Sequence, residues 1–203
     1  MLFKLNSKIQ ENLNLKTYEN YRWFFTSKGN LVIGGKNEAQ NEIVMKKFLK
    51  PSYTILHTSF PGSPFMIVLT ENPTERDIEE AAVVCACFSK QWKEGKKRIE
   101  VDVFKGENVY KTKKMKIGTF GVKGEKKKIK VKPELILVFQ AGKLRAVPSS
   151  TKIKKIALIK QGKLSKEEAA KKIMKKIKDK FHLPITKEEV MQAIPSDKID
   201  VQF

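Results

Sequence analysis

Cysteine and histidine are scarce in this chain, with two of each among 203 residues. Cys85 and Cys87 stand one residue apart in an apolar run, a spacing at which a disulfide is sterically poor. A zinc site of the common kind needs a Cys-x-x-Cys pair and a second pair of ligands, which the sequence does not offer. We therefore expect two buried thiols in a reducing cytoplasm, and neither a disulfide framework nor a metal site.

Long apolar runs and acidic residues are also few. No apolar run approaches the ~20 residues of a membrane-spanning helix, and no signal peptide opens the chain, so we expect a cytoplasmic protein. The chain has 42 Lys and Arg against 22 Asp and Glu, a net charge of +20. Such a charge repels itself, so a polyanion is the natural partner. Nucleic acid is favoured over an anionic membrane surface.

The positive charge is concentrated in one part of the chain. Residues 105–132 hold eleven basic and two acidic side chains, and residues 133–164 hold seven and one, which together account for +15 of the +20. Over residues 126–132 lysine alternates with Ile and Val, which places lysines on one face of a strand, where they suit phosphate contacts. Lysines that protect a solvated sheet edge are the alternative. Eleven basic residues exceed what edge protection needs, which favours binding of a polyanion.

A strand, a glycine turn and a helix are expected in succession near the N-terminus. Residues 31–33 are typical of a short buried strand, Gly34-Gly35 break it, and Asn37 with Gln40 form an Asn-x-x-Gln capping box. Glycines ahead of a helix N-terminus let the backbone approach a ligand, and the free N–H groups attract anions. Lys36 adds a positive charge at the same place. A plain strand, turn and capped helix is the alternative.

A nucleotide-binding P-loop does not fit this stretch. A P-loop requires Gly, four residues, and then Gly-Lys-Ser/Thr. The segment from Gly29 to Gly35 is one residue too long, and Asn37 stands where a hydroxyl residue is needed. We therefore expect no ATP site here.

Two further helices and an aromatic cluster indicate where the core lies. Residues 74–77 cap a helix whose apolar stripe continues to Trp92, and a helix this apolar must be central and buried. The helix from Asn37 is expected to turn Ile43 inward and to stop at Pro51. The aromatic residues of 18–25 could stack on bases, but aromatic clusters are more often core.

Strands dominate after Gly95, and helices return near the C-terminus. Residues 99–103 alternate as a half-buried strand, residues 135–159 supply more strands, and capping boxes start helices at residues 165 and 186. We therefore predict an α+β fold, with a mixed or antiparallel sheet and a buried central helix, followed by a short C-terminal helical segment.

His57 is the one candidate for catalysis. It is expected at a strand end before a Pro/Gly loop, where an imidazole could contact phosphate or act as an acid or base. No second His and no Cys–His pair stands near it in the sequence, which favours binding. We predict no catalytic residue, no metal and no cofactor.

A series of short motifs, in order along the chain, carries a family resemblance. They are Tyr21–Phe25, the Gly-Gly-Lys-Asn-x-x-Gln-Asn-Glu of 34–42, His57 with Pro61-Gly62-Ser63, Cys87-Phe88-Ser89-x-x-Trp92, Lys111, and the Gly-Thr-Phe-x-Val-Lys-Gly of 118–124. Together they resemble the RNA-binding region of the NFACT family of ribosome quality-control proteins, and the tail resembles the archaeal members. The resemblance implies binding of tRNA or large-subunit ribosomal RNA, with the stalled large ribosomal subunit as partner.

Two departures from the family limit what the resemblance implies. Family members usually have Asp two residues after the His, where Ser59 stands here, which weakens an acid–base or metal role. Full-length members carry an N-terminal half, implicated in selecting tRNA, and a long coiled coil before this region. We therefore expect no tail elongation by this chain alone. Residues 1–16 are expected to be a short amphipathic helix, the stub of that coiled coil, and a separate polypeptide is expected to supply the missing half; folding back on the chain's own surface is the alternative.

Residues 17–164 are expected to form the RNA-binding domain, with 165–203 as a helical segment packed on it. The predicted RNA-binding residues are Arg22, Gly34, Gly35, Lys36, Asn37, Gln40, His57, Lys111, Lys113, Lys114, Lys116, Lys123, Lys126, Lys127, Lys128 and Lys130. Two alternative functions stay open. One is an RNA-modification or RNA-processing enzyme, or its accessory subunit, acting on tRNA, and the other is a structural protein that docks on the ribosome.

Overall fold

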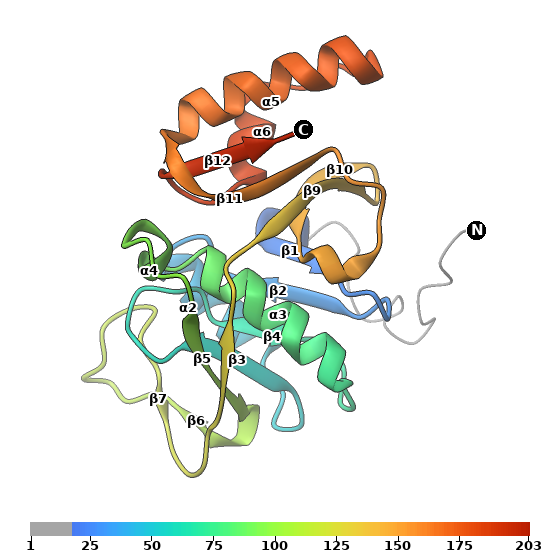
Figure 1. The fold of residues 1–203 in the computed structure, drawn as a ribbon. Helices are drawn as coiled ribbons and strands as arrows, with labels where there is room; N and C mark the ends of the chain where they lie inside the picture. The colour runs from blue at the N-terminus through green and yellow to red at the C-terminus, as the bar shows by residue number, and fades with distance from the viewer. Residues whose placement is uncertain (1–17) are drawn as a thin grey trace.

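Residues 18–203 are described by a computed structural model, in which two antiparallel sheets carry helices on their faces (Figure 1). The strands of the larger sheet, in sequence order, are β1 (Arg22–Phe25), β2 (Leu31–Gly34), β3 (Thr54–Thr58), β4 (Met66–Val68), β5 (Ile99–Lys105) and β8 (Lys127–Val131). Their spatial order is β1-β2-β4-β3-β5-β8. The predicted α+β class with antiparallel pairing is confirmed. The helix expected over residues 1–16 lies outside the described residues.

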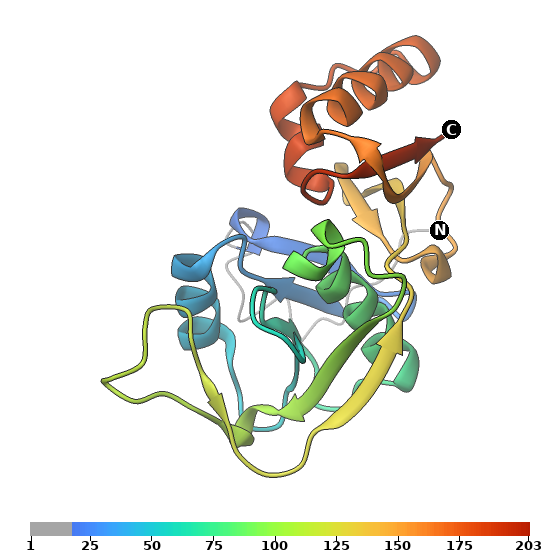
Figure 2. The ribbon, with the colours of Figure 1, turned by 60° about the vertical axis from the view of Figure 1, so that its left-hand side comes forward.

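Two layers cover the six-stranded sheet, one on each face. Helix α3 (Glu75–Cys87) packs with Phe24, Val32 and Leu56 of the sheet. The opposite face packs against α2 (Glu38–Phe48) and the segment from η2 (Gly106–Asn108) to β8, which holds the short ladder of β6 (Val109–Tyr110) and β7 (Gly121–Val122). Because the side chains of a strand alternate between the two faces of the sheet, consecutive residues pack into different cores. Figure 2 shows the segment between β6 and β7 projecting from the side that carries α2.

Helix α3 is the buried central helix that the sequence predicts. Thr74 caps it, and its partner in the capping box is Asp77. The helix ends at Cys87, earlier than its apolar stripe suggests, because the chain turns at Phe88 and restarts as α4 (Lys90–Lys93). Trp92 therefore belongs to a separate short helix. The apolar spacing continued across the break because both helices bury residues in the same core.

Helix α2 corrects one expectation, that for Ile43. Ile43 is 49% exposed, and the buried positions are Val44, Met45 and Phe48. The helix ends at Phe48, before Pro51. The expectation for Ile43 was wrong because the inward stripe of this short helix is narrow, and Ile43 falls just outside it.

Residues 135–202 form a second unit, here called the C-terminal unit (orange to red in Figure 2). Its sheet contains β9 (Leu135–Gln140), β10 (Lys143–Val147), β11 (Ala157–Leu164) and β12 (Ile199–Gln202), with η3 (Ser149–Thr151) after β10 and helices α5 (Lys166–Phe181) and α6 (Lys187–Ala193). The order is β10-β9-β11-β12. The predicted C-terminal helices are present, and they pack on this sheet. The change of sheet falls between β8 and β9, while the division at 164/165 stays a prediction.

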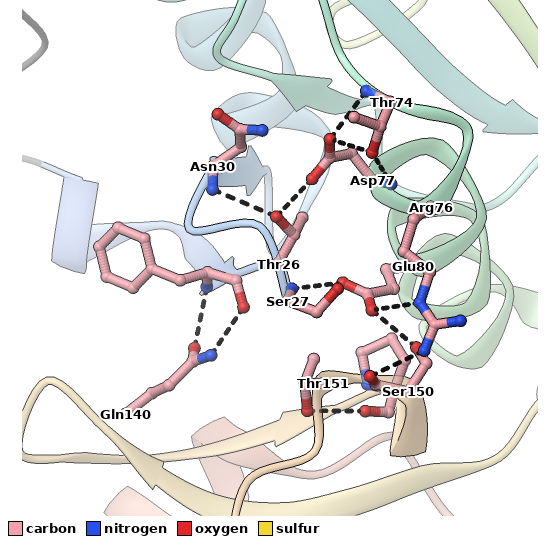
Figure 3. Close-up of polar contacts among 12 residues, drawn as sticks. Thr26, Ser27, Asn30, Thr74, Arg76, Asp77, Glu80, Gln140, Ser150 and Thr151 are labelled. Atoms are coloured by element: carbon pink, nitrogen blue, oxygen red, sulfur yellow. Dashed lines mark hydrogen bonds and ion pairs between the residues drawn. The ribbon is translucent and has the colours of Figure 1, made fainter. Parts of the chain in front are cut away.

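A polar network joins the two sheets (Figure 3). The Gln140 carboxamide accepts from the Phe25 backbone N–H at 2.8 Å and donates to the Phe25 carbonyl at 2.6 Å. Glu80 on α3 accepts from the Ser27 N–H at 2.7 Å and from the Ser150 hydroxyl at 2.8 Å. Trp92 adds a further joint, because its buried ring packs in the core that both sheets share and its Nε1–H donates to the Ser196 carbonyl at 3.0 Å. The C-terminal unit is therefore fastened to the six-stranded sheet and its helices at several points.

The aromatic cluster near the N-terminus is core, as favoured from the sequence. Tyr18, Trp23 and Phe24 are buried, and Phe25 packs partly buried beside them. The rings of Tyr18 and Trp23 meet edge to face with centroids 5.0 Å apart. These rings are not available for stacking on bases.

Candidate nucleic-acid interface

Three of the four predicted lysines at and just before strand β8 are paired with carboxylates of neighbouring elements. Lys128 Nζ lies 2.7 Å from Glu100 Oε1, and Lys126 Nζ lies 3.6 Å from Asp102 Oδ2; both carboxylates belong to β5, the strand that pairs with β8. Lys127 contacts exposed Glu75 of α3 at 3.6 Å. Cross-strand pairs of this kind reduce the net field at the sheet edge. Lys130 alone of these four has no carboxylate within 4 Å in residues 18–203.

Lys111 is a structural anchor for the segment between β6 and β7. Its ammonium donates to Glu42 Oε2 at 2.8 Å and to the carbonyls of Lys116 and Thr119 at 2.7 and 2.9 Å. Glu42 also accepts from the Gly118 N–H at 2.9 Å. These hydrogen bonds, that from Lys111 first, lower the pKa of Glu42 to about 2. The three N–H donors of the Lys111 ammonium are thus all used in hydrogen bonds within the protein.

The other lysines of this segment, and Lys123 directly after β7, are exposed and have no carboxylate partner among the described residues. Lys113, Lys114, Lys116 and Lys123 make no ion pair with any residue of the described part of the chain. Ile117, between them, is 66% exposed. Three cations without carboxylate partners on the projecting segment, with Lys123 directly after β7, form the strongest phosphate-binding candidate among the predicted residues.

The glycine turn has a packing role. A Cβ at Gly35 would lie 2.4 Å from the backbone nitrogen of Asn41, and one at Gly34 would lie 2.4 Å from Met66 Sδ. Neither position has space for a side chain, which explains both glycines without a ligand. The turn brings β2 and α2 into direct contact.

The polar residues of the turn cap helix α2. The Asn37 side chain accepts from the Gln40 N–H at 2.8 Å, while Gln40 Oε1 accepts from the Lys36 N–H at 3.1 Å. The expected capping box is therefore incomplete. The Gln40 side chain accepts from the N–H of Lys36, the residue before the cap, and not from the N–H of Asn37. Both N–H groups are occupied, which reduces what this helix end offers to an anion.

The His57 ring packs against Phe65 and is uncharged at neutral pH. Its ring centroid lies 4.4 Å from that of Phe65, and its Nδ1 lies 2.7 Å from the Thr58 carbonyl, which makes Nδ1 the protonated nitrogen. Burial lowers the pKa of His57 below its usual value, against the opposing charge of Asp102. The ring can contact a ligand through Nε2 but supplies no positive charge at neutral pH.

A groove beside β8 contains residues that the sequence analysis missed. It has a volume of about 510 Å³ and is lined by Phe60, Lys96, Arg98 and Lys130, together with Glu94 and Glu100. Phe60 is 61% exposed. An exposed ring next to cations can stack a base while the cations hold phosphates. The signal was available in the sequence, because Phe60 lies in the His57 loop, but nothing there placed Lys96 and Arg98 beside it.

Arg22 lies apart from these lysines, in a cavity between the two units that also holds Lys36. The structure therefore divides the predicted residues among β8, the projecting segment, the His57 loop and this cavity. It does not bring them together into one surface stripe.

The described residues offer little to catalysis. Burial raises the pKa of the Cys85 thiol to about 12 and that of Cys87 well above its usual value, so neither is a nucleophile. In residues 18–203 no three His, Cys, Asp or Glu side chains gather as metal ligands. Within the same range, none of the helices has the length and apolar character to cross a bilayer.

Comparison with known proteins identifies the family. The family model for the NFACT protein RNA binding domain matches residues 20–124, slightly more than half of the chain. The chain belongs to the NFACT family. The match spans β1 to β7 and includes the glycine turn, His57 and the projecting segment, so the resemblance seen in the sequence is confirmed.

Curated NFACT relatives are much longer than the matched region. The archaeal Rqc2 homolog aRqcH of Methanocaldococcus jannaschii is 32% identical over 117 residues, which are 55% of this chain and 17% of that protein. The human ribosome quality control complex subunit NEMF is 31% identical over 91 residues, 42% of this chain and 8% of that protein. The chain thus spans less than a fifth of these relatives.

A solved structure is similar to slightly more than half of the chain. It is the C-terminal region of the fibronectin/fibrinogen-binding protein from Streptococcus suis, 25% identical with a TM-score of 0.50. The similarity covers 56% of this NFACT chain and 45% of that one.

Proposed function

We propose that this chain is an RNA-binding protein of ribosome quality control, which holds tRNA or large-subunit ribosomal RNA on stalled large ribosomal subunits in the cytoplasm. The observation that carries the proposal is the set of unpaired lysines on the projecting segment, within the region that matches the RNA-binding domain. Ribosome quality control is named in curated relatives with 31% identity. Phosphates would be held by Lys113, Lys114, Lys116 and Lys123, and a base would stack on Phe60.

The salt dependence of RNA binding tests this assignment. One variant replaces Lys113, Lys114 and Lys116 by Gln, and a matched variant replaces Lys126, Lys127 and Lys128. Each lost phosphate contact flattens the log–log salt slope by about 0.7 to 0.9, depending on strandedness. We expect about two units of flattening in the first variant and less in the second, whose lysines already face carboxylates.

The matched pair removes the same number of charges, so a difference between the variants reports position and not net charge. Circular dichroism checks that both variants are folded. Slopes that stay at the wild-type value in both variants would contradict these surfaces as the RNA interface.

Binding without catalysis is part of the proposal. The enzymatic alternative requires a covalent change in RNA, which mass spectrometry of tRNA and ribosomal RNA after incubation would detect. The docking alternative is separated by comparing stalled large subunits that carry peptidyl-tRNA with empty subunits. Equal affinity for both would favour a structural ribosome-docking protein. Cross-linking and sequencing would identify the bound RNA.

We also propose that a separate polypeptide supplies the regions that the longer relatives have in addition to the matched domain. A native pull-down with tagged chain, analysed by mass spectrometry, tests this. We expect a protein that resembles the N-terminal half of the relatives to be recovered with the large subunit. Recovery of large subunits without such a protein would contradict the proposal.

A further inference from the structure

A cavity lies between the six-stranded sheet and the C-terminal unit, and cations from both parts line it. They are Arg22 at the start of β1, Lys36 after the glycine turn, and Arg145 on β10. The rings of Trp23 and Phe88 form part of its wall. The space open to the centre of a water-sized molecule is about 20 Å³, which suits one small group and not a base.

Stacking on aromatic rings fixes both arginines. The central guanidinium carbon of Arg22 lies 3.6 Å from the ring centroid of Phe88, and that of Arg145 lies 4.1 Å from the ring of Trp23. Stacking sets the plane of a guanidinium and leaves its N–H groups at the edge available. Arg145 Nη1 donates to the Leu144 carbonyl at 2.8 Å. The Nε atoms of Arg22 and Arg145 and the Nε1 of Trp23 are buried and have no hydrogen-bond partner in residues 18–203.

The positive charge of the cavity is not balanced by the described part of the chain. No carboxylate there lies within 4 Å of Arg22, Arg145 or Lys36. Burial, and then Arg145, lower the pKa of Arg22 to about 9, and burial followed by both arginines lowers that of Lys36. Burial lowers the pKa of Arg145 against the opposing charge of Glu19, and burial followed by the charge of Arg22 lowers the pKa of Lys166. Like charges in a partly buried site are unfavourable until an anion joins them.

We propose that this cavity is an oxyanion site that binds one phosphate group, with the guanidinium groups of Arg22 and Arg145 donating to its oxygens and the exposed Lys36 closing the mouth. The forked N–H groups of a guanidinium match the oxygens of a phosphate. A phosphate would neutralise the like charges and give the buried donors acceptors. Because Arg22 and Arg145 belong to different sheets, an occupied site also ties the C-terminal unit to the RNA-binding domain.

Thermal unfolding of the full chain tests the site with inorganic phosphate as the probe. Sodium phosphate at about 50 mM is compared with sodium chloride at equal ionic strength and pH. A ligand that binds the folded state raises the melting temperature, and we expect a rise of about 3 to 6 °C. Arg22→Gln and Arg145→Gln should each abolish this rise, and Lys36→Gln should reduce it. The exposed Lys154→Gln, which lies outside every proposed binding surface and also removes one positive charge, is the matched control and should keep it.

The rise is measured within each variant against its own chloride sample, so a change in baseline stability does not affect it. Lys36 is exposed, and its variant keeps the test valid if an arginine variant fails to fold. The proposal is overturned if phosphate gives the wild type no rise, or if Arg22→Gln and Arg145→Gln keep the full rise. An equal rise with acetate overturns the assignment to phosphate.

A second measurement identifies the source of the phosphate group, an RNA backbone or the free ion. Binding of a short single-stranded RNA is measured in phosphate-free buffer. If the RNA occupies the site, Arg145→Gln weakens binding about fivefold or more, and bound RNA removes the effect of phosphate. If the free ion is the ligand, RNA affinity is unchanged and the phosphate effect persists. The phosphate test does not involve RNA, so its result holds even if the chain does not bind RNA. The two experiments therefore distinguish failure of this site from failure of the proposed function.

Discussion

Lys111 Nζ lies 2.8 Å from Glu42 Oε2, and the same ammonium holds the carbonyl oxygens of Lys116 and Thr119. One side chain thus fastens the projecting segment to helix α2. The segment whose other lysines we propose as RNA contacts is therefore positioned by a lysine whose three N–H donors are all used within the protein.

Lys111→Met is therefore expected to destabilise the protein. The substitution removes a charged donor and leaves Glu42 and two carbonyls without it, which costs about 1 to 3 kcal/mol of unfolding free energy. Urea unfolding measures the loss. Lys113→Met is the control and should change the unfolding free energy by about 0.5 kcal/mol or less, because its side chain is exposed and unpaired. Equal effects of the two substitutions would contradict the anchoring role.

The pKa of Glu42 predicts a pH dependence of stability. Its folded value of about 2 lies below the usual 4.5, so the unfolded state binds the proton more readily between these values. The contribution is fully present above about pH 4.5 and is lost as the pH falls toward 2. Urea unfolding between pH 6 and pH 3 should show a smaller loss in Glu42→Gln than in the wild type. Parallel curves for the two proteins would show that the carboxylate carries no such linkage.

Phe60→Ala is expected to weaken RNA binding without loss of stability. Base stacking on an aromatic ring contributes about 1 to 3 kcal/mol per base, so the dissociation constant should rise about tenfold. The ring is largely exposed, so the melting temperature should stay within a degree or two of the wild type. Fluorescence anisotropy with a labelled RNA measures the affinity. Phe60→Tyr, which keeps the ring, should bind as the wild type does.

His57→Phe separates stacking from charge at the His57 position. The stacked, neutral ring predicts that His57→Phe keeps RNA affinity within about twofold at pH 7.5, while His57→Ala weakens it modestly. A large loss in both variants would require a specific role for the imidazole. Loss of a covalent activity on RNA in His57→Ala would overturn the view that the protein only binds.

The sequence predicted best where the signal is local. Thr74, Ser165 and Thr186 each begin a capping box that the structure contains, because the partners lie three residues apart on the same turn. Alternation likewise predicted strand β5, but its expected half-buried character was wrong, because Asp102 and Phe104 on the second face are buried as well. The break between α3 and α4 was missed, because both helices bury apolar residues in one core and the spacing carries across the turn.

The site was harder to predict because its partners are distant in the sequence. Lys128 looked free until β8 paired with β5 and set it beside Glu100, 28 residues away. Arg145 carries no motif, and its importance follows only from the packing of β10 against Trp23. Charge composition predicts that a polyanion binds, but the three-dimensional pairing decides which cations remain available for it.

The pairing between Gln140 and Phe25 has a consequence for the free RNA-binding domain. Strand β1 is an outer strand of its sheet, and the Gln140 carboxamide occupies both backbone groups of Phe25 as a neighbouring peptide would. An unoccupied strand edge invites pairing with another molecule. Cutting the chain before β9 would therefore uncover a templating edge as well as apolar surface. The C-terminal unit thus covers the edge of the six-stranded sheet at Phe25, and we expect a chain cut before β9 to self-associate.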